Sequence, residues 1–207
     1  MKIRTHFETM PDLYAKTAPT QAKVHGIPVV SFPFTVEFAV DQIARQSSAQ
    51  VRYLHWAFTD PDSIPVCGFE WIHWTVANVP VSALAVSGDS AQSKIYEIPE
   101  DFTHYIDSED ALSGVVQGKT SQASRFVGGT DPAITMHYNG PQPPDVDHEY
   151  WLRVWATSEP LTQLHTGFWF NELTRALRLQ KQAGQSEQSG HSGQWLDCDE
   201  LRIIGRA

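Results

Sequence analysis

Proline and glycine interrupt this sequence at short intervals, which leaves little room for long helices. The 207 residues include 13 Pro and 13 Gly, and the segments between them are rich in the β-branched and aromatic residues that favour strands. Pairs such as Asp60-Pro61 and Val79-Pro80 end these segments, because Pro fixes φ and Gly permits positive φ in turns. The pattern predicts a mainly β protein and favours a sandwich over a doubly wound α/β sheet.

Three segments have the composition of strands, and one has the pattern of a helix. The strand candidates are residues 51–58, 71–79 and 150–156. The helix candidate begins with Asn171 as its cap and Glu172 in its first turn, and apolar residues follow at helical spacing from Leu173 onwards. We expect this short helix near the C-terminus to end close to Gln182.

The C-terminal part of the sequence changes composition twice. Residues 183–194 (AGQSEQSGHSGQ) have no apolar side chain after Ala183, so they predict a polar surface loop. Apolar character returns in residues 201–204, and we expect this C-terminal segment to pack against the same domain. The length and the aromatic content predict one domain over residues 1–207.

The charge balance and the cysteines disfavour several functional classes. With 15 Lys and Arg against 24 Asp and Glu, the net charge is −9, which argues against a nucleic-acid binder because phosphate backbones attract clustered basic residues. Cys67 and Cys198 form no CxxC pair, so they predict free thiols rather than a zinc ribbon or a disulfide framework. The sequence has no apolar stretch long enough to predict a membrane span, and no signal peptide is visible. We therefore expect a cytoplasmic protein.

Common phosphate and cofactor motifs are missing from the sequence, and no cofactor is expected. The sequence has no GxGxxG, GxxxxGK[ST], GxSxG or HExxH. What stands out is a set of polar clusters at the ends of predicted strands. They are residues 59–62 (TDPD), residues 71–74 (WIHW), residues 140–144 (GPQPP) and residues 148–150 (HEY).

Each cluster has an ordinary structural interpretation when it is taken alone. Strand alternation places His73 on the face of Thr75, opposite Trp74, where a histidine is most often a hydrogen-bonded core residue. Asp60 stands before a proline and can simply start a turn. Tyr150 can be a core aromatic whose hydroxyl reaches the rim.

Together, the clusters resemble the signature of the phosphatidylethanolamine-binding protein (PEBP) family, in particular its bacterial and archaeal branch, often called Raf-kinase-inhibitor-like. The family shows a DPDxP motif, a GxxxHW-type strand, and GPxPP followed by HxY. Here these read DPDSIP from residue 60, GFEWIHW from residue 68, and GPQPP and HEY as given above. All of them occur in family order, and the resemblance covers roughly residues 20–180.

The resemblance implies a β-sandwich of antiparallel-rich sheets with a shallow pocket for small anions, such as phosphate and the phosphate of phosphoethanolamine head groups. Carried over position by position, the pocket lining would be Asp60, His73, Gly140, Pro141, His148 and Tyr150. Imidazolium, tyrosine hydroxyl and backbone N–H groups supply the donors that a phosphate needs. Asp60 would sit behind an imidazole, where it would orient the ring and favour its charged form.

The sequence departs from the family pattern in three places. Gly68 stands where many eukaryotic members have tyrosine, and Glu149 stands where many members have arginine. A carboxylate there would weaken an anion field near the pocket. Residues 118–137 look longer than the corresponding family segment, so the rim is expected to have its own ligand preference.

An enzyme is the main alternative to a binding protein. Asp60 with His73 and His148 could form the acid–base assembly of a hydrolase that acts on a phosphoester or acyl substrate. Cys67, Ser121 and Ser124 are the candidate nucleophiles, but none has a recognisable elbow or base spacing.

Two further alternatives concern metals and protein partners. Asp60, His73 and His148 are a ligand set suited to zinc or iron. Some family members suggest regulation of a kinase or a protease by protein contact. We expect a non-catalytic protein, with no metal and no catalytic residue, that binds a small anionic or phosphorylated ligand.

Overall fold

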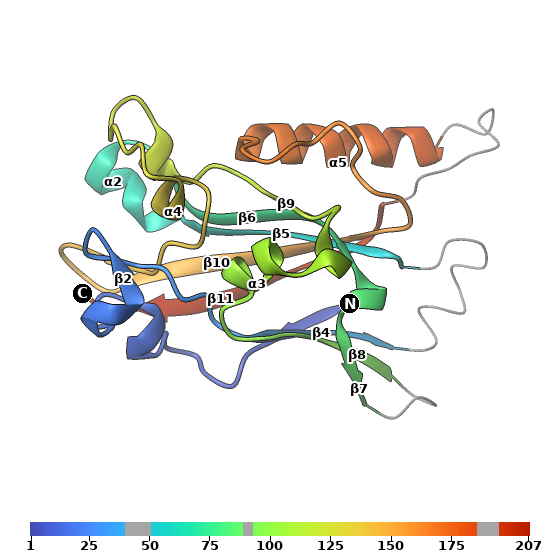
Figure 1. The fold of residues 1–207 in the computed structure, drawn as a ribbon, viewed down its shortest axis with the longest axis horizontal. Helices are drawn as coiled ribbons and strands as arrows, with labels where there is room; N and C mark the ends of the chain where they lie inside the picture. The colour runs from blue at the N-terminus through green and yellow to red at the C-terminus, as the bar shows by residue number, and fades with distance from the viewer. Residues whose placement is uncertain (40–50, 89–92, 186–194) are drawn as a thin grey trace.

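Two antiparallel sheets lie face to face in the computed structural model, which describes residues 1–39, 51–88, 93–185 and 195–207 (Figure 1). The five-stranded sheet consists, in spatial order, of β11 (Trp195–Gly205), β10 (His148–Thr157), β5 (Tyr53–Asp60), β6 (Trp71–Pro80) and β9 (Val116–Gln117). The four-stranded sheet consists of β1 (Lys2–Arg4), β4 (Phe34–Ala39), β8 (Ser93–Ile98) and β7 (Ala85–Ser87). The predicted mainly β sandwich is confirmed.

Short elements join the strands. A small ribbon pairs β2 (Lys23–Val24) with β3 (Ile27–Pro28). The helices in the described ranges are α2 (Ile64–Cys67), α3 (Phe102–Ser108), α4 (Pro132–Thr135) and α5 (Phe170–Gln185). Turns of 3-10 helix are η1 (Asp12–Tyr14), η2 (Thr20–Ala22), η3 (Pro61–Ser63), η4 (Val81–Ala83), η5 (Asp110–Leu112) and η6 (Ser121–Ala123). Within these ranges, no helix is both long and apolar enough to cross a membrane.

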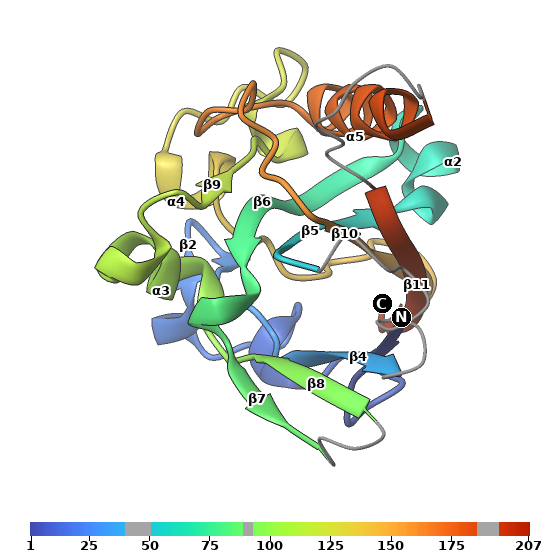
Figure 2. The same cartoon turned by 90° about the vertical axis from the view of Figure 1, so that its right-hand side faces the viewer.

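Aromatic side chains fill the space between the two sheets. Figure 2 shows the ribbons of the two sheets after a turn of 90° from Figure 1. Trp56 of β5 meets Phe34 of β4 edge to face, with ring centroids 5.4 Å apart, and it contacts Trp74 of β6 at 5.2 Å. All three side chains are buried. Burial of such large rings contributes several kcal/mol to folding, roughly 25 cal/mol for each Å² of apolar surface removed from water.

A second apolar layer lies on the outer face of the five-stranded sheet, where α5 packs (Figure 1). Leu173, Ala176 and Leu177 of α5 are buried against Ala77 of β6 and the segment before the helix. Both faces of β6 are therefore covered, so its residues are buried almost continuously and do not alternate between buried and exposed.

The ends of α5 correct two sequence expectations. The helix begins at Phe170, so Asn171 lies inside its first turn and is not the cap. The backbone N–H of Trp169 instead donates to Glu172 Oε2 at 2.7 Å, because a glutamate in the first turn can reach back to the start of a helix. At the other end the helix continues to Gln185, so residues 183–185 are not loop. Residues 186–194 of the predicted loop lie outside the described residues.

The predicted strands are all present with shifted ends. Residues 51–58 correspond to β5, which runs on to Asp60, and residues 150–156 are the middle of β10. The C-terminal segment forms β11, which pairs with β10 from His148↔Gly205 to Thr157↔Trp195. The expectation that this segment docks on the sheet is confirmed.

Candidate functional site

The antiparallel order brings the polar clusters to one end of the five-stranded sheet. The strand β5 ends at Asp60, and its neighbours β6 and β10 both begin there, at Trp71 and His148. Asp60 pairs with Trp71 across β5 and β6, and Thr59 pairs with Trp151 across β5 and β10. Residues that are far apart in the sequence therefore meet at a single edge.

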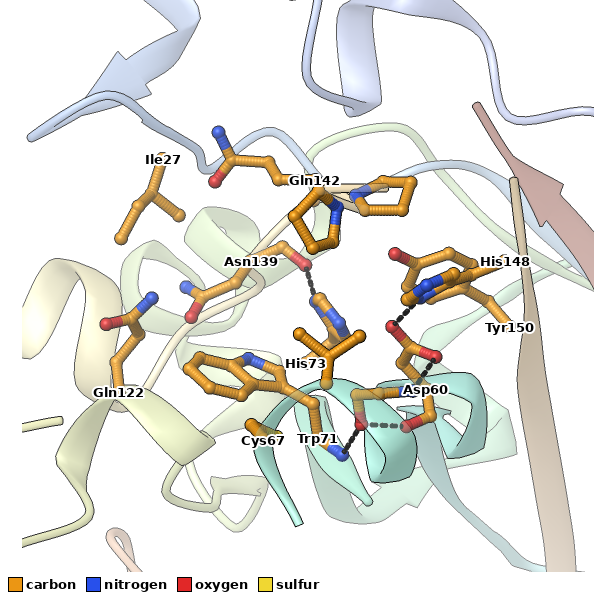
Figure 3. A pocket seen from close by; sticks show the side chains of 15 residues that line it. Ile27, Asp60, Cys67, Trp71, His73, Gln122, Asn139, Gln142, His148 and Tyr150 are labelled. Atoms are coloured by element: carbon orange, nitrogen blue, oxygen red, sulfur yellow. Dashed lines mark hydrogen bonds and ion pairs between the residues drawn. The ribbon is translucent and has the colours of Figure 1, made fainter. Parts of the chain in front are cut away.

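A loop across this edge closes a cavity. Residues 139–144 run along it, and the Gly140 N–H donates to Pro28 O of β3 at 2.9 Å. A Cβ on Gly140 would lie 2.1 Å from Tyr14 O, so only glycine permits this close approach. The cavity has a volume of about 260 Å³. Its lining is formed by Ile27, Asp60, Ser63, Val66, Cys67, Trp71, His73, Gln122, Asn139, Gly140, Gln142, Pro143, Pro144, His148 and Tyr150 (Figure 3).

Five of the six expected pocket residues belong to this lining, and Pro141 does not. Pro141 is buried, and its side chain lies against Gly205 at the end of β11. The GPQPP segment curves, so that its first proline supports the loop from behind while Pro143 and Pro144 reach the cavity.

Asp60 has both of the roles that its sequence context suggested. Its Oδ1 accepts a hydrogen bond from the Ser63 backbone N–H at 3.0 Å and so caps η3. Its Oδ2 lies 2.8 Å from His148 Nδ1. One carboxylate therefore starts the turn with one oxygen and orients an imidazole with the other.

His148 is held between two carboxylates. Its Nδ1 faces Asp60, and its Nε2 lies 3.1 Å from Asp145 Oδ1. Burial by itself would lower the pKa of His148, but the hydrogen bonds and negative charges of Asp60 and Asp145 outweigh burial and raise this pKa above its usual value. The ring therefore favours its charged form.

His73 is aimed by an irregularity in β6. The register between β5 and β6 shifts between Phe58↔Trp74 and Thr59↔Ile72, which leaves His73 as an extra residue in the strand. Its ring packs on Phe58 and Tyr150, which belong to the same apolar core as Trp74. The expected strict alternation, with His73 opposite Trp74, is therefore wrong at this point.

The hydrogen bond of His73 fixes its tautomer. Nδ1 lies 2.8 Å from the backbone oxygen of Asn139, and a carbonyl oxygen can only accept, so Nδ1 carries the proton. Burial lowers the pKa of His73 to about 4, although the nearby Asp60 charge acts in the opposite direction. His73 is therefore neutral near pH 7, and its Nε2 presents a lone pair.

Tyr150 completes the polar wall. The side chain is 1% exposed and lies beside His73, with ring centroids 5.1 Å apart. Burial raises the pKa of Tyr150, and the Asp60 charge raises it further. The hydroxyl therefore keeps its proton throughout the physiological pH range.

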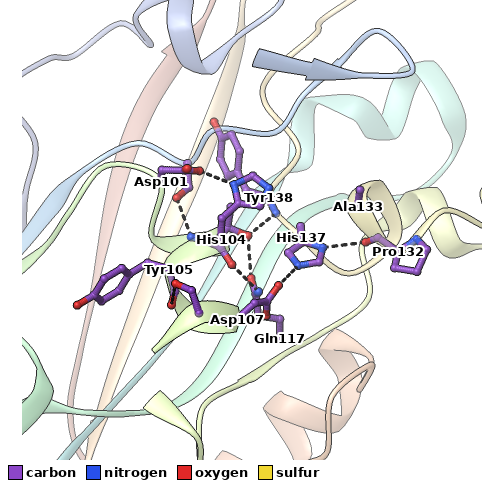
Figure 4. A network of polar contacts seen from close by, with 12 residues as sticks. Asp101, His104, Tyr105, Asp107, Gln117, Pro132, Ala133, His137 and Tyr138 are labelled. Carbon is purple, nitrogen blue, oxygen red and sulfur yellow. Dashed lines mark hydrogen bonds and ion pairs between the residues drawn. The ribbon is translucent and has the colours of Figure 1, made fainter. Parts of the chain in front are cut away.

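A polar network holds the segment that precedes Asn139, and Figure 4 shows the part of it around Gln117 and Tyr138. Gln117 Oε1 lies 2.9 Å from Trp74 Nε1 and 2.8 Å from Thr103 Oγ1. Thr103 Oγ1 in turn accepts from the Tyr138 backbone N–H at 3.0 Å. The Asn139 N–H donates to His73 O at 3.0 Å, so the segment and β6 hold each other in place.

Several lining residues were not predicted from the sequence. Asn139 directly precedes the GPQPP segment, and Trp71 lies two residues before His73, so proximity to the motifs could have indicated both. Gln122 comes from residues 118–137, the segment for which a distinct effect on the rim was expected. Ile27 of β3 carries no signal in the sequence.

Glu149 has its polar contacts on the sheet. Its Oε1 accepts from Trp151 Nε1 at 3.0 Å and lies 3.2 Å from Arg202 Nη1. Its carboxylate is therefore paired with a basic side chain, and Glu149 is not among the described residues of the cavity lining.

The hydrolase alternative finds no support in this geometry. Within the described ranges, neither His73 nor His148 has a hydroxyl or a thiol as a hydrogen-bond partner. Ser121 Oγ accepts from the Ile72 N–H at 2.8 Å, and Cys67 Sγ lies 3.3 Å from Phe69 O. Among the described residues of the cavity lining and its rim, none of these candidate nucleophiles is therefore paired with a base.

The metal alternative also finds no support in the arrangement of these side chains. In the parts of the chain that are described, no group of three or more His, Cys, Asp or Glu side chains is arranged to hold a metal ion. The histidine nitrogens that could ligate face protein partners in three cases of four, at Asn139 O, Asp60 Oδ2 and Asp145 Oδ1.

Comparison with known proteins agrees with the fold and the motifs. Residues 5–187 match the sequence model of the phosphatidylethanolamine-binding proteins, and the chain belongs to this family, whose membership supports a binding-protein role. The chain is 39% identical to the uncharacterized protein YxkA of Bacillus subtilis over 167 residues, which covers 81% of this chain and 84% of YxkA.

Two solved structures share the fold at low sequence identity. YbcL of Escherichia coli, described as a member of the mammalian PEBP family, aligns with a TM-score of 0.60 and 15% identity over 100% of this chain and 98% of YbcL. A PEBP homologue of Chlamydia trachomatis aligns with a TM-score of 0.56 and 18% identity, covering 98% of this chain and 94% of the homologue.

Proposed function

We propose that the protein is a non-catalytic binding protein whose cavity takes small anions and phosphorylated head groups such as phosphoethanolamine. The observation that carries the proposal is the convergence of His73, His148 and Tyr150 on one cavity of about 260 Å³. Such a cavity holds the volume of roughly eight or nine water molecules, which suits a head group better than a whole lipid. It also has no nucleophile paired with a base, which favours binding over catalysis.

The charge state of the site supports a small oxyanion in a specific way. His148 favours its charged form and lies between the carboxylates of Asp60 and Asp145, so the opposite charges at this wall partly offset one another. The Tyr150 hydroxyl is hydrogen-bonded to the Asp60 carboxylate, whereas the indole N–H of Trp71 on the same wall can donate to a ligand oxygen. A cytoplasmic location and regulation of a partner kinase or protease stay predictions of the sequence, and the ligand proposal does not depend on them.

Titration of isotopically labelled protein with phosphate and then O-phosphorylethanolamine, followed by NMR near pH 6.5, tests the proposal. We expect amide signals of His73, Gly140 and His148 to shift together and to saturate. The variants His73→Ala and His148→Ala should keep the dispersed spectrum of the folded protein and bind at least about tenfold more weakly. His73→Ala loses roughly one hydrogen bond to a charged ligand, and His148→Ala leaves the Asp60 and Asp145 carboxylates without their imidazole partner close to the anion. Unchanged affinity in both variants would contradict the assignment of this cavity.

A further inference from the structure

The cavity that we propose for anions has few cationic groups of its own. Its lining contains no Lys and no Arg. Lys16 lies at the rim, where its Nζ donates to the carbonyl of the lining residue Pro143 at 3.1 Å. A dianion in this cavity would therefore meet no Lys or Arg among the described lining residues, and much of its negative charge would need another kind of compensation.

His148 cannot provide that compensation. Both of its ring nitrogens already face carboxylates, Asp60 at 2.8 Å and Asp145 at 3.1 Å. Asp62, the remaining acid of the DPD segment, accepts the Glu149 N–H at 2.8 Å and adds negative charge close by. Of the histidines in the lining, only His73 has a nitrogen without a protein partner in the described ranges.

The nitrogen that His73 offers is an acceptor. Its Nδ1 donates to Asn139 O, so Nε2 of the neutral ring carries a lone pair and no hydrogen. Burial holds the ring in this neutral form. The titratable groups around the ring are Asp60 from β5 and His148 and Tyr150 from β10, with Cys67 of α2 also on the cavity wall.

A donor lies close to this acceptor. The indole N–H of Trp71, another lining residue, lies beside His73 and below Asn139 in Figure 3. The Tyr150 hydroxyl is engaged with the Asp60 carboxylate, whose hydrogen bond helps to raise the pKa of Tyr150. The wall therefore offers an acceptor and a donor side by side.

A ligand that matches this wall must both accept and donate hydrogen bonds. We infer that the cavity selects oxyanions that carry a proton, and so distinguishes a phosphate monoester from a sulfate ester of the same shape. The inference rests on the proposed function. A phosphate monoester has its second pKa near about 6, so part of it keeps one P–OH near neutral pH. That hydroxyl can donate to His73 Nε2, while the other oxygens accept from the wall.

A sulfate ester lacks this hydrogen, because it is fully ionised over the same pH range. Its oxygens would face the lone pair of His73 Nε2 directly, and a buried acceptor would be left unpaired. Sites built to hydrogen-bond a hydroxyl reject analogues without it strongly. We therefore expect affinity for the sulfate ester to be at least about tenfold lower.

The test compares O-phosphorylethanolamine with ethanolamine O-sulfate, which share the amine and the carbon chain, by NMR titration of the whole protein at pH 6, 7 and 8. The phosphate ester should bind, and its affinity should rise about tenfold for each unit by which the pH falls from 8 toward the ligand's second pKa. The sulfate ester should bind at least about tenfold more weakly at pH 6. Equal affinity for the two esters would overturn the inference and leave the proposed function standing. Failure of both esters to bind would overturn both.

A variant tests the role of the His73 nitrogen. His73→Ala removes the lone pair, so the ratio of the affinities for O-phosphorylethanolamine and ethanolamine O-sulfate should fall to near one. The matched control is His165→Ala, because His165 is exposed and is not part of the cavity lining. If His73→Ala kept the selectivity of the parent protein, His73 would not be the discriminating group and the inference would be wrong.

Discussion

At the scale of single residues, the cavity depends on a close backbone contact as much as on its polar side chains. Gly140 lies where a Cβ would come within 2.1 Å of Tyr14 O and 2.7 Å of Pro28 Cβ. These atoms belong to segments that the core holds in place, since Tyr14 and Pro28 are both buried. The shape of the cavity therefore relies on the missing side chain.

We predict that Gly140→Ala lowers the free energy of unfolding by about 1–3 kcal/mol, the usual cost of forcing an extra methyl group into a packed site. Ligand affinity should fall as well, because the loop must move. The control is Gly114→Ala, where a Cβ would meet nothing within 4 Å. Urea denaturation of both variants checks this, and equal stabilities would show that the loop yields without cost.

A second residue-scale prediction concerns His55, which is fully buried in β5. Its Nδ1 accepts from the Asn78 N–H at 3.0 Å and its Nε2 lies 2.8 Å from Thr157 Oγ1. Burial lowers the pKa of His55 to about 3. As the pH falls below about 6.5, His55 becomes protonated in the unfolded chain but stays neutral in the folded protein. The contribution of His55 to stability is therefore fully present above pH 6.5 and is lost as the pH falls toward 3.

We expect the free energy of unfolding to fall between pH 6.5 and pH 4, with a slope from His55 that approaches about 1.4 kcal/mol per pH unit. His73 adds to this slope, because burial lowers its pKa to about 4. His148, whose pKa is raised, acts in the opposite direction and loses its contribution as the pH rises. Denaturation curves from pH 4 to 8 measure the slope. His55→Gln should reduce it, and an unchanged slope in this variant would contradict the assignment to His55.

Much of the site could be predicted at this scale because its motifs carry chemistry in their side chains. Asp60, His73, Gly140, His148 and Tyr150 all line the cavity. The tautomer of His73 could not be predicted, because it is set by the backbone carbonyl of Asn139. Every residue has a backbone carbonyl, so the sequence does not indicate which one will contact the ring. The strand bulge at His73 was missed for a similar reason, since alternation assumes that strand pairing is regular.

At the scale of elements, α5 is a separate layer rather than part of the sandwich core. Leu173 of α5 is fully buried on the side of the helix that faces the sheet, whereas Leu179 of the same helix is 51% exposed. We predict that Leu173→Ala costs about 2–5 kcal/mol of unfolding free energy and that Leu179→Ala costs less than about 0.5 kcal/mol. Thermal and urea denaturation check the difference.

The same pair of variants tests whether the two apolar clusters act independently. The cavity lining contains no residue of α5, so Leu173→Ala should leave phosphate-ester affinity unchanged under conditions where the protein is folded. A loss of affinity in the folded variant would show that the outer layer also positions the site.

The existence of the elements was easier to predict than their ends. The apolar spacing after Leu173 identified the helix, but both Asn171 and Glu172 can satisfy an N-terminal N–H, and the glutamate does so here. Composition alone placed the end of the helix at Gln182, whereas α5 continues through Ala183 and Gly184 to Gln185. Ala and Gln are good helix formers, so the helix extends past a single Gly before it ends.

At the scale of the whole molecule, composition predicted the β class, and the motifs predicted the family fold. The order of strands in each sheet follows from neither, because alternation and turn residues say nothing about which strands become neighbours. That order determines the site, because β5 lies between β6 and β10. The polar residues at the end of β5 and at the starts of β6 and β10 therefore lie at one edge of the sheet.

The contact between Asp60 and His148 spans 88 positions of sequence, and this has a consequence for biosynthesis. Closing so long a loop is entropically costly, and contacts of this kind form late in folding. During translation, the nascent chain can form the turn after Asp60 early, because Asp60 Oδ1 bonds to the nearby Ser63 N–H. Asp60 Oδ2 has no His148 imidazole to pair with until β10 has left the ribosome. The cavity that we propose as the ligand site is therefore incomplete until β10 is in place, so a ligand that binds there would not guide the earlier steps of folding and would stabilise only the assembled sheet.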